Sequence, residues 1–406
     1  MKDTEQDVLK TAAELLDLYA RRKLTRGFAF DRSPEFESAF LESFKYPHTR
    51  DQLTAIREIF TDMESSDPMD RLLAGDVGFG KTEVAMNAAY KAVLSGKQVA
   101  VISPLVVLTL EHIESFRERF MGRDVHIECL SRLTSPREER RILTELSDGN
   151  IDVIIATHRV LGEDIDFKNL GLLIIDEEHR FGVKDKERIK KLRQEIDILS
   201  LSATPIPRSL NMALGGMRTL SVLRDPPPSR KPIHTQILAW NAGIITKAIM
   251  DELDRDGQVL FLHNRVTSLE GTAAELKRMC GPKLKPILLH GQMLGHEIED
   301  ALIAFREGHG NCLVSTTVIE NGVNFLRANT IIIDHADEFG LAQLHQLRGR
   351  VGRSDKVAHA ILLYRKPILA EDAKKRLLAI AEHTELGAGF EIALRDLEIR
   401  GAGEIL

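Results

Sequence analysis

Cysteine, tryptophan and long apolar runs are scarce in this sequence of 406 residues. The three cysteines, Cys129, Cys280 and Cys312, form neither a CxxC pair nor a metal-binding spacing. They predict buried thiols in a reducing cytosol rather than a disulfide framework or a zinc site. No run of about 18 apolar residues occurs, and the acidic N-terminus "MKDTEQDVLKTAAELL" does not resemble a signal peptide. We therefore expect a cytoplasmic protein without a membrane partner.

An excess of basic residues is also lacking. The chain has 55 Lys and Arg against 61 Asp and Glu, a net charge of −6. This balance weakens the case for nucleic-acid binding without excluding it, because a motor can hold DNA through local amides and a few basic residues. Hydrophobic residues make up 43% and charged residues 29%, which is typical of a soluble globular protein. The length favours two or three domains.

Short β-branched runs alternate with helical patterns from Arg71 to about Val222. The expected strands are "RLLAG", "QVAVIS", "VHIECL", "DVIIAT", "GLLIIDEE" and "DILSLSAT". This alternation predicts βαβ units and a parallel sheet covered by helices. The Pro-rich stretch "DPPPSRKP" (225–232) predicts a linker. The alternation then resumes with "GQVLFLH", "KPILLH", "NCLVST" and "ANTIIIDHA", so two α/β domains in tandem are expected, although no strict sequence repeat is visible.

Both ends of the chain read as helical. Residues 7–23 carry apolar residues at a spacing of three to four, which predicts a long amphipathic helix. After Tyr364, "LAEDAKKRLLAIAEHTEL" predicts a further helix, followed by the glycine-punctuated end "GAGFEIALRDLEIRGAGEIL".

The segment "GDVGFGKT" fits the phosphate-loop pattern G-x-x-x-x-G-K-[ST]. Glycines allow backbone N–H groups to point at phosphate oxygens, Lys81 can reach the β- and γ-phosphates, and Thr82 can bind Mg²⁺. An expected strand before it and an expected helix after it disfavour an ordinary glycine-rich turn. The predicted nucleotide contacts here are Gly75, Gly78, Gly80, Lys81, Thr82 and Glu83.

An acidic cluster, "DEEH", follows the apolar run "LLII". A carboxylate at a strand end can hold Mg²⁺, and its neighbour can orient and deprotonate the attacking water. We predict that Asp176 binds the metal and that Glu177 acts on the water. On its own such a cluster is as often a solvated loop. The hydroxyls of "SATPIPRSL", Ser202 and Thr204, together with His179, can report the nucleotide state, although a capped turn explains them nearly as well.

The segment "QLRGRVGRS" (346–354) places several arginines in a glycine-rich stretch of the second expected domain. Guanidinium groups suit the spread charge of a transferring phosphoryl group. A basic surface loop is the alternative. With a phosphate loop in the preceding domain, we predict arginine fingers supplied by Arg350 and Arg353, with Gln346 beside them.

The ordered segments "GDVGFGKT", "DEEH", "SAT", "TTVIENGV" and "QLRGRVGR" resemble the superfamily 2 helicases and translocases with two RecA-like domains. Within them, "LGLLIIDEEHRFGVKDKERIK" and "LSATPIPRSLNMAL" look most like the bacterial transcription-repair coupling factors. The sister family of fork-reversing helicases shares much of this, but typically has Ser at the position of Phe79 and "RGPGE" in place of "RGAGE".

The resemblance implies a domain organisation. Residues 1–24 would form a relay-like helix, 25–228 the first RecA-like domain, 229–366 the second, and 367–406 a truncated helical hairpin of the translocation motif. It covers only the motor of a larger family protein, so the expected partners, RNA polymerase and repair proteins, would bind through domains absent here. A monomer is expected.

The resemblance also implies site residues. Gln52 would read the adenine edge with Tyr46 stacked nearby, although a buried aromatic and a turn are the alternative. Gly322 and Asn324 would contact the nucleotide. The family usually has Asp at the position of Asn324, where the carboxylate can accept a hydrogen bond from a ribose hydroxyl. An amide oxygen accepts this hydrogen bond more weakly because it carries no charge. Arg395 and Arg400 would couple nucleotide state to DNA movement. The implied DNA-backbone contacts are Pro104, Arg132, Thr157, His158, Asn264, Arg265, Gln292, Thr316 and Thr317.

These predictions amount to the ATP- and Mg²⁺-dependent core of a translocase on double-stranded DNA. The resemblance implies that the full protein displaces RNA polymerase stalled at DNA lesions and couples transcription to nucleotide excision repair. Two alternatives remain open. A fork-reversing helicase would need a wedge domain that the sequence does not show. A nucleotide-binding interaction module would switch partners with little turnover, and ATP hydrolysis above background would exclude it.

Overall fold

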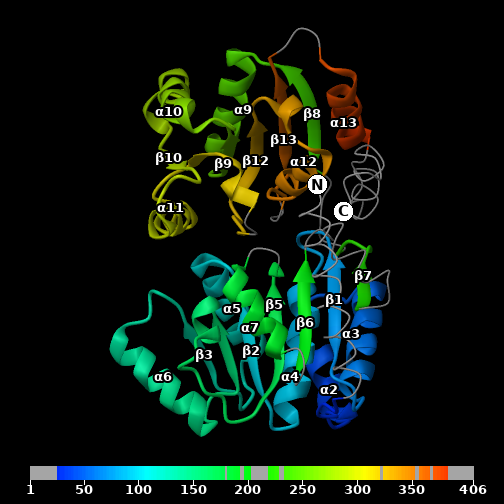
Figure 1. Cartoon of the computed structure of the whole chain (residues 1–406). Helices are drawn as coiled ribbons and strands as arrows, with labels where there is room; N and C mark the ends of the chain where they lie inside the picture. The colour runs from blue at the N-terminus through cyan, green and yellow to red at the C-terminus, as the bar shows by residue number, and fades with distance from the viewer. Residues whose placement is uncertain are drawn as a thin grey trace, which may run out of the picture. The chain divides into compact units, whose positions relative to one another are not determined.

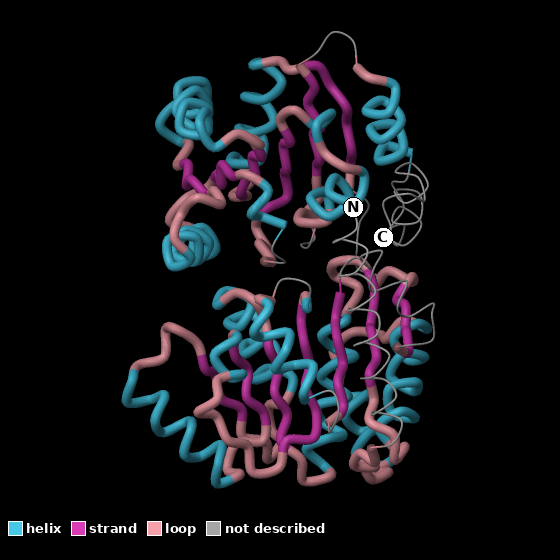
Figure 2. The backbone as a smooth tube through the Cα atoms, in the orientation of Figure 1, coloured by secondary structure: helices cyan, strands magenta, loops and turns pink. Residues whose placement is uncertain are grey.

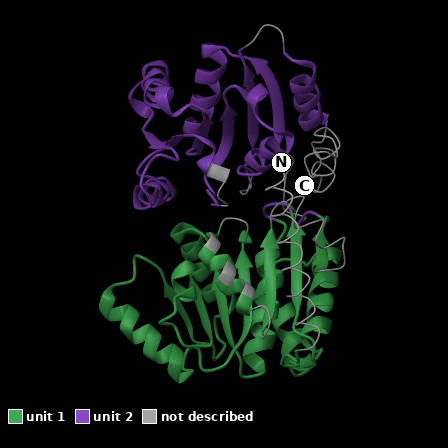
Figure 3. Ribbon diagram, viewed as in Figure 1, with its two compact units in different colours: residues 1–75, 79–225, 402–406 green, residues 76–78, 226–401 purple. Residues whose placement is uncertain are grey.

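The structure is a computed structural model that describes residues 25–178, 181–192, 196–202, 218–227, 233–320, 323–352, 356–365 and 369–382. The expected helix at 7–23 and the part of the expected hairpin 367–406 that follows residue 382 lie outside these residues. The chain divides into two compact units, one of residues 1–75, 79–225 and 402–406 and one of residues 76–78 and 226–401, called unit 1 and unit 2 (Figure 3). Among the described residues, no helix combines the length and the apolar character that crossing a bilayer requires.

Unit 1 contains a seven-stranded sheet in the order β3-β4-β2-β5-β6-β1-β7, and all of its pairings are parallel (Figure 1). Four interior strands, β1, β2, β4 and β6, are buried along their whole length, as expected for a sheet covered on both faces. The strands are β1 (Asp70–Gly75), β2 (Gln98–Ile102), β3 (Ile127–Leu130), β4 (Val153–Ala156), β5 (Leu170–Asp176), β6 (Asp197–Ser202) and β7 (Thr219–Leu223).

The helices of unit 1 begin and end where local chemistry allows. In α6 (Pro136–Asp148), Ser135 accepts a hydrogen bond from the Glu138 amide at the N-terminus, and Gly149 ends the helix in the left-handed conformation. The other helical segments are α2 (Pro34–Glu42), α3 (Arg50–Met63), α4 (Lys81–Leu94), α5 (Val106–Arg119), η1 (His158–Leu161) and α7 (Val183–Leu192).

Unit 2 contains a six-stranded parallel sheet in the order β10-β11-β9-β12-β13-β8. Figure 2 shows its strands between helices, as in unit 1. The strands are β8 (His234–Ala239), β9 (Gln258–Leu262), β10 (Pro286–Leu289), β11 (Cys312–Ser315), β12 (Ala328–Ile333) and β13 (His359–Tyr364). The helical segments are α9 (Ala242–Asp254), α10 (Val266–Cys280), η3 (Gly281–Lys283), α11 (Gly295–Glu307), η4 (Thr317–Glu320), η5 (Ala336–Glu338), α12 (Leu341–Arg348) and α13 (Glu371–Glu382).

Each sheet forms the centre of its own core. In unit 1, Ile154 on β4 and Leu173 and Ile175 on β5 are at most 1% exposed. In unit 2, Phe261 and Ile332 are equally buried. The predicted fold class, two α/β parallel-sheet domains, is confirmed.

Candidate nucleotide site and nucleic-acid contacts

The phosphate loop joins the buried strand β1 to the N-terminus of α4. Gly78 and Gly80 have φ angles of 83° and 80°, a left-handed conformation that glycine adopts without strain. A Cβ atom at Gly80 would lie 2.3 Å from the Nε2 atom of Gln52, so a side chain there would also clash. The Lys81 ammonium donates a hydrogen bond of 2.6 Å to the Gly75 carbonyl and so bridges the two ends of the loop.

Gln52 supports this loop. Its Oε1 atom accepts a hydrogen bond from the Thr49 amide (2.9 Å), and its Nε2 atom donates one to the Phe79 carbonyl (2.9 Å). Gln52 is 3% exposed, so its amide group connects the cap of α3 to the phosphate loop. Tyr46 is 53% exposed and presents a ring to solvent. Adenine recognition by these two residues stays a prediction.

Glu83, in the first turn of α4, is buried and held from three sides. Arg119 donates to both of its carboxylate oxygens at 2.9 Å, and His48 and Asn87 lie at 3.3 and 3.0 Å. Burial raises the pKa of Glu83, but the hydrogen bonds from His48, Arg119 and Asn87 outweigh it, so the pKa lies below its ordinary value. Glu83 thus anchors α4 to α5. The sequence gives no signal for Arg119 because it lies 36 residues away.

The acidic turn follows β5. Asp176 ends the strand, and its Oδ2 atom lies 3.0 Å from Nε2 of His112 on α5. Burial lowers the pKa of His112, but the hydrogen bond and charge of Asp176 more than offset this and raise it above its usual value. Glu177 has a φ of 50°, which is uncommon for a residue with a side chain and is found at functional sites. Its amide donates to the Leu201 carbonyl on the neighbouring strand β6.

The donor set of this site fits Mg²⁺. A carboxylate at the end of β5 and the Thr82 hydroxyl at the start of α4 are hard oxygen ligands of the kind that Mg²⁺ prefers, and Mg²⁺ usually takes only one or two protein carboxylates. The side chain of Asp176 is 16% exposed, and its Oδ2 atom is positioned by His112. The roles of Asp176 and Thr82 as metal ligands, and of the neighbouring Glu177 in acting on the water, stay predictions.

The arginines of "QLRGRVGRS" differ from one another. Arg348 is buried and donates a hydrogen bond of 2.8 Å to the Ile380 carbonyl on α13, with a second contact to His345, so it holds unit 2 together. Arg350 follows α12 and is 1% exposed, and Gln346 lies half-buried on α12. Six further predicted residues lie outside the described residues: His179, Thr204, Gly322, Arg353, Arg395 and Arg400.

The predicted DNA contacts of unit 1 gather at one edge of its sheet. Pro104, Arg132 and Thr157 follow the carboxyl ends of β2, β3 and β4, three strands that are neighbours in the sheet. The Thr157 amide donates to the Leu130 carbonyl of β3, and η1 begins at the next residue, His158. Arg132 and His158 are exposed.

Unit 2 repeats this arrangement. Asn264, Gln292 and Thr316 follow β9, β10 and β11, which are neighbours in the same relative order. The Thr316 amide donates to the Leu289 carbonyl of β10, and η4 begins at Thr317. Asn264, Arg265 and Gln292 are exposed. In both units the fold therefore brings together residues that are far apart in the sequence.

A buried network supports the segment around Asn264. His263 lies 2.9 Å from Oδ2 of Asp334 through Nδ1 and 2.7 Å from the Ser268 hydroxyl through Nε2. This is the hydrogen-bonding order of a serine hydrolase triad. Arg365, however, donates to both oxygens of Asp334 at 3.0 and 2.9 Å and neutralises the charge that would stabilise an imidazolium. We assign the network to holding the segment that carries Asn264 and Arg265.

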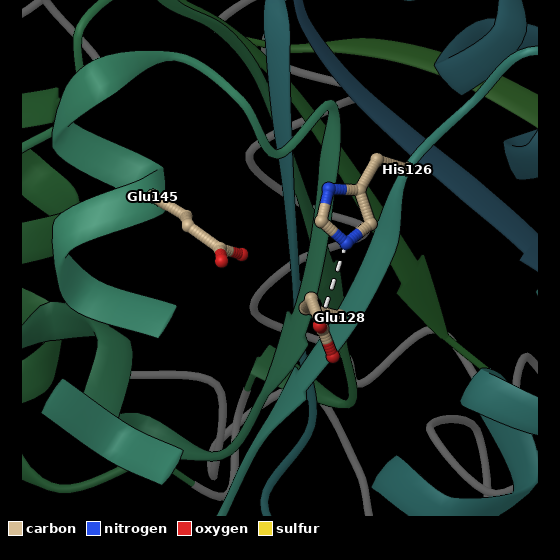
Figure 4. Close-up of side chains that lie close together, drawn as sticks. All are labelled: His126, Glu128 and Glu145. Atoms are coloured by element: carbon tan, nitrogen blue, oxygen red, sulfur yellow. Dashed lines mark ion pairs between the residues drawn. The ribbon is translucent and has the colours of Figure 1, made fainter. Parts of the chain in front are cut away.

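One further cluster has a metal-like composition. Figure 4 shows His126, Glu128 and Glu145, whose ligand atoms lie within 4.8 Å of one another. Arg141 donates to Glu128 at 2.5 Å and to Glu145 at 2.6 Å, so a guanidinium already occupies the position of a cation between the two carboxylates. The cluster is an ion-pair network on β3 and α6 rather than a cation site.

Comparisons with known proteins agree with this geometry. Residues 49–213 match the DEAD/DEAH box helicase family and residues 243–355 match the helicase conserved C-terminal domain. The chain is 48% identical to the transcription-repair-coupling factor of Bacillus subtilis (strain 168) over 406 residues, which is all of this chain and 34% of the relative. It is 50% identical to that of Escherichia coli (strain K12) over 402 residues, or 99% of this chain and 35% of the relative.

A solved structure of RecG bound to a three-way DNA junction is similar at a TM-score of 0.84 and 36% identity, covering 97% of this chain and 53% of that one. The chain spans about a third of the length of the curated relatives. Sequence and fold therefore agree: the chain carries the two helicase domains of a superfamily 2 motor core and matches, over its whole length, about a third of the length of the transcription-repair-coupling factors.

Proposed function

We propose that this chain is an ATP-driven translocase on double-stranded DNA and that unit 1 carries the hydrolytic site. The observation that carries the proposal is the sheet order β5-β6-β1. The phosphate loop follows β1 and the acidic turn follows β5, so both lie at the carboxyl edge of the same parallel sheet, separated by one strand. Ligands of open α/β sheets bind at this edge.

Each residue of the site has a chemical role. The loop amides and Lys81 hold the phosphates, and Glu177 orients the attacking water and accepts its proton. Thr82 and Asp176 would hold Mg²⁺, which neutralises charge on the phosphate oxygens when it is bound. Arg350 and Arg353 of the second domain would stabilise the charge of the transferring phosphoryl group.

The nucleic-acid contacts lie at the strand ends of both units. Exposed Arg132, Asn264 and Arg265, together with amides and hydroxyls at the starts of η1 and η4, suit phosphate oxygens rather than base edges. Such contacts give binding that does not depend on base sequence, as a motor that moves along DNA requires. The RecG structure with a DNA junction supports nucleic-acid binding by a chain of this fold.

The relatives' name supports a more specific role. The relatives are named for the coupling of transcription to repair. We therefore extend the proposal to displacement of RNA polymerase stalled at DNA lesions. In this proposal the protein is a cytoplasmic monomer that works with RNA polymerase and repair proteins.

Steady-state ATP hydrolysis by the chain tests the proposal. It should be measured without DNA, with single-stranded DNA and with linear duplex, beside Glu177→Gln. We expect duplex to stimulate turnover most and the variant to abolish it. Wild-type turnover no higher than that of the variant would refute hydrolysis at this site, and equal rates under the three conditions would refute duplex coupling.

Fork reversal is the second candidate because of the similarity to RecG on a three-way junction. The higher identity to the coupling factors, 48–50% against 36%, favours duplex translocation. Unwinding of a three-way junction at a rate above that of translocation along linear duplex would favour fork reversal instead.

A further inference from the structure

A buried arginine in unit 1 connects strands β1 and β6 to the acidic turn that follows β5. Arg218 donates through Nε to Asp70 at 2.9 Å, through Nη2 to the Ser200 hydroxyl at 2.8 Å and through Nη1 to Glu178 at 3.2 Å. The Ser200 hydroxyl in turn donates to the same Oε2 atom of Glu178 at 2.9 Å. The side chains of Arg218 and Asp70 are 4% and 5% exposed, so this ion pair is shielded from solvent, whereas the Glu178 side chain is 27% exposed.

The position of this network links it to hydrolysis. Asp70 begins β1, Ser200 lies in β6, Arg218 directly precedes β7, and Glu178 follows β5. Glu178 is the residue after Glu177, whose φ is 50°. Because Glu178 is held by the Ser200 hydroxyl on the neighbouring strand β6 and by the Arg218 guanidinium, the left-handed turn at Glu177 is fixed from its far side.

The fold itself does not require these charges. In unit 1, Ser200 on β6 pairs with Ile175 on β5 and Leu72 on β1. In unit 2, Leu362 on β13 pairs in the same way with Ile333 on β12 and Ile237 on β8. By that register the counterparts of Asp70, Ser200 and Glu178 in unit 2 are Thr235, Leu362 and Ala336. A sheet of the same order therefore forms without the network, which occurs in the unit that carries the phosphate loop.

Arg218 also has a distinctive place in the chain. It directly follows residues 203–217, the segment after β6 that contains Thr204. We infer that Arg218 is a positioning residue for ATP hydrolysis: it holds Glu178 so that the Glu177 carboxylate faces the nucleotide. This inference rests on the proposed ATPase function.

Loss of the guanidinium should therefore affect turnover more than nucleotide affinity. Without it, two carboxylates remain near one another, and the turn at Glu177 loses its support. A misplacement of about 1 Å in a catalytic group lowers rates by about 100-fold. The phosphate loop, held by Gln52 and Lys81, keeps its own contacts.

The experiment compares Arg218→Met and Arg218→Lys with a matched control, Arg71→Met. Arg71 is equally buried, at 7% exposed, and contacts Asp62 and Glu58 on α3 and Ser221 on β7, away from the acidic turn. For each variant, kcat and KM for ATP, binding of a fluorescent ADP analogue and Tm should be measured, with wild type and Glu177→Gln in the same assay.

We expect Arg218→Met to lower kcat about 10- to 100-fold with KM and ADP affinity within about threefold of wild type, and Arg218→Lys to restore part of the rate. Arg71→Met should lower Tm by a similar amount but keep kcat within about threefold. Should Arg218→Met fail to fold, Ser200→Ala, which removes only the bridging hydroxyl, should still lower kcat about three- to tenfold.

Equal loss of kcat in Arg218→Met and Arg71→Met, or an unchanged kcat in Arg218→Met, would overturn the positioning role while leaving the ATPase intact. A fall in ADP affinity that accounts for the whole loss of activity would do the same. Wild-type turnover no higher than that of Glu177→Gln would overturn both the inference and the proposed function.

Discussion

Unit 1 and unit 2 are built on the same sheet order, although the sequence shows no strict repeat. Strands β3-β4-β2-β5-β6-β1 correspond one by one to β10-β11-β9-β12-β13-β8, and unit 1 adds β7 at the edge. The correspondence extends to single side chains. Gln98 on β2 donates to the Leu146 carbonyl in the last turn of α6 and to the Ile151 carbonyl after it. Gln258 on β9 makes the same pair of bonds, to Phe305 in the last turn of α11 and to Gly310 after it.

The likeness continues to the acidic strand ends, where it becomes instructive. Asp176 and Asp334 each contact a histidine, His112 and His263 respectively. The residues that follow them, Glu177 and His335, have φ angles of 50° and 53°. In unit 2, Arg365 neutralises the carboxylate and an imidazole follows it. In unit 1, a second carboxylate follows and a phosphate loop lies one strand away. One architecture therefore supports either a hydrolytic site or a structural ion pair.

The largest expected difference is in the rate of ATP hydrolysis when equivalent residues of the two units are changed. Glu177→Gln removes the proton acceptor and should lower kcat by about 10³-fold, within the range for general bases. The matching change in unit 2, His335→Asn, keeps a residue that tolerates the left-handed conformation and should leave kcat within about twofold. Steady-state ATPase assays of both variants decide this. A comparable loss of kcat in both variants would contradict the assignment of hydrolysis to the strand end of unit 1 alone.

The ion pair of unit 2 should appear as a pH dependence of stability. Burial raises the pKa of Asp334, but hydrogen bonds from His263 and Arg365 outweigh it and bring the pKa from 3.8 to about 2. The ionised carboxylate therefore stabilises unit 2 by about 2 kcal/mol above pH 4, and this contribution is lost as the pH falls towards 2.

Trp240, the only tryptophan, lies in unit 2 with the Arg365 guanidinium 4.7 Å from its ring, so its fluorescence follows unfolding of this unit in urea. Asp334→Asn should be less stable at pH 5 and lose the dependence between pH 4 and 2. If the stability of Asp334→Asn falls between pH 4 and 2 as steeply as that of the wild type, other groups cause the acid sensitivity.

The paired glutamines test the equivalence of the two sheets. Gln98→Met and Gln258→Met each leave two buried carbonyls without their side-chain donor, which should cost about 1–2 kcal/mol per variant. Calorimetry of both variants, with Trp240 fluorescence to separate unit 2, measures the losses. If the two losses in free energy of unfolding differ by more than about 2 kcal/mol, the paired hydrogen bonds do not contribute equally to the stability of the two units.

The smallest effect is expected at Asn324, which is half-buried before the buried Phe325 in unit 2. An Asp at this position would accept a charge-assisted hydrogen bond from the ribose, so Asn324→Asp should tighten ATP binding about threefold. Isothermal titration with a non-hydrolysable ATP analogue measures this. Unchanged affinity and turnover would mean that the amide serves as well as the acid.

The sequence predicted the fold class because its βαβ alternation is strong in both halves. It also located the phosphate loop and the acidic turn, since glycines with positive φ and a carboxylate after an apolar strand are local signals. The supports of the site were not predictable in the same way. His112, Arg119 and Arg218 reach Asp176, Glu83 and Glu178 across 36 to 64 residues, and only the folded sheet makes them neighbours.

Movement along DNA is the central claim, and displacement of a third strand tests it most directly. A linear duplex carrying a triplex-forming oligonucleotide should be incubated with the chain and ATP, and release of the oligonucleotide followed by fluorescence. We predict ATP-dependent release by the wild type and none by Glu177→Gln. ATP hydrolysis at full rate without any release of the third strand would contradict translocation by this chain.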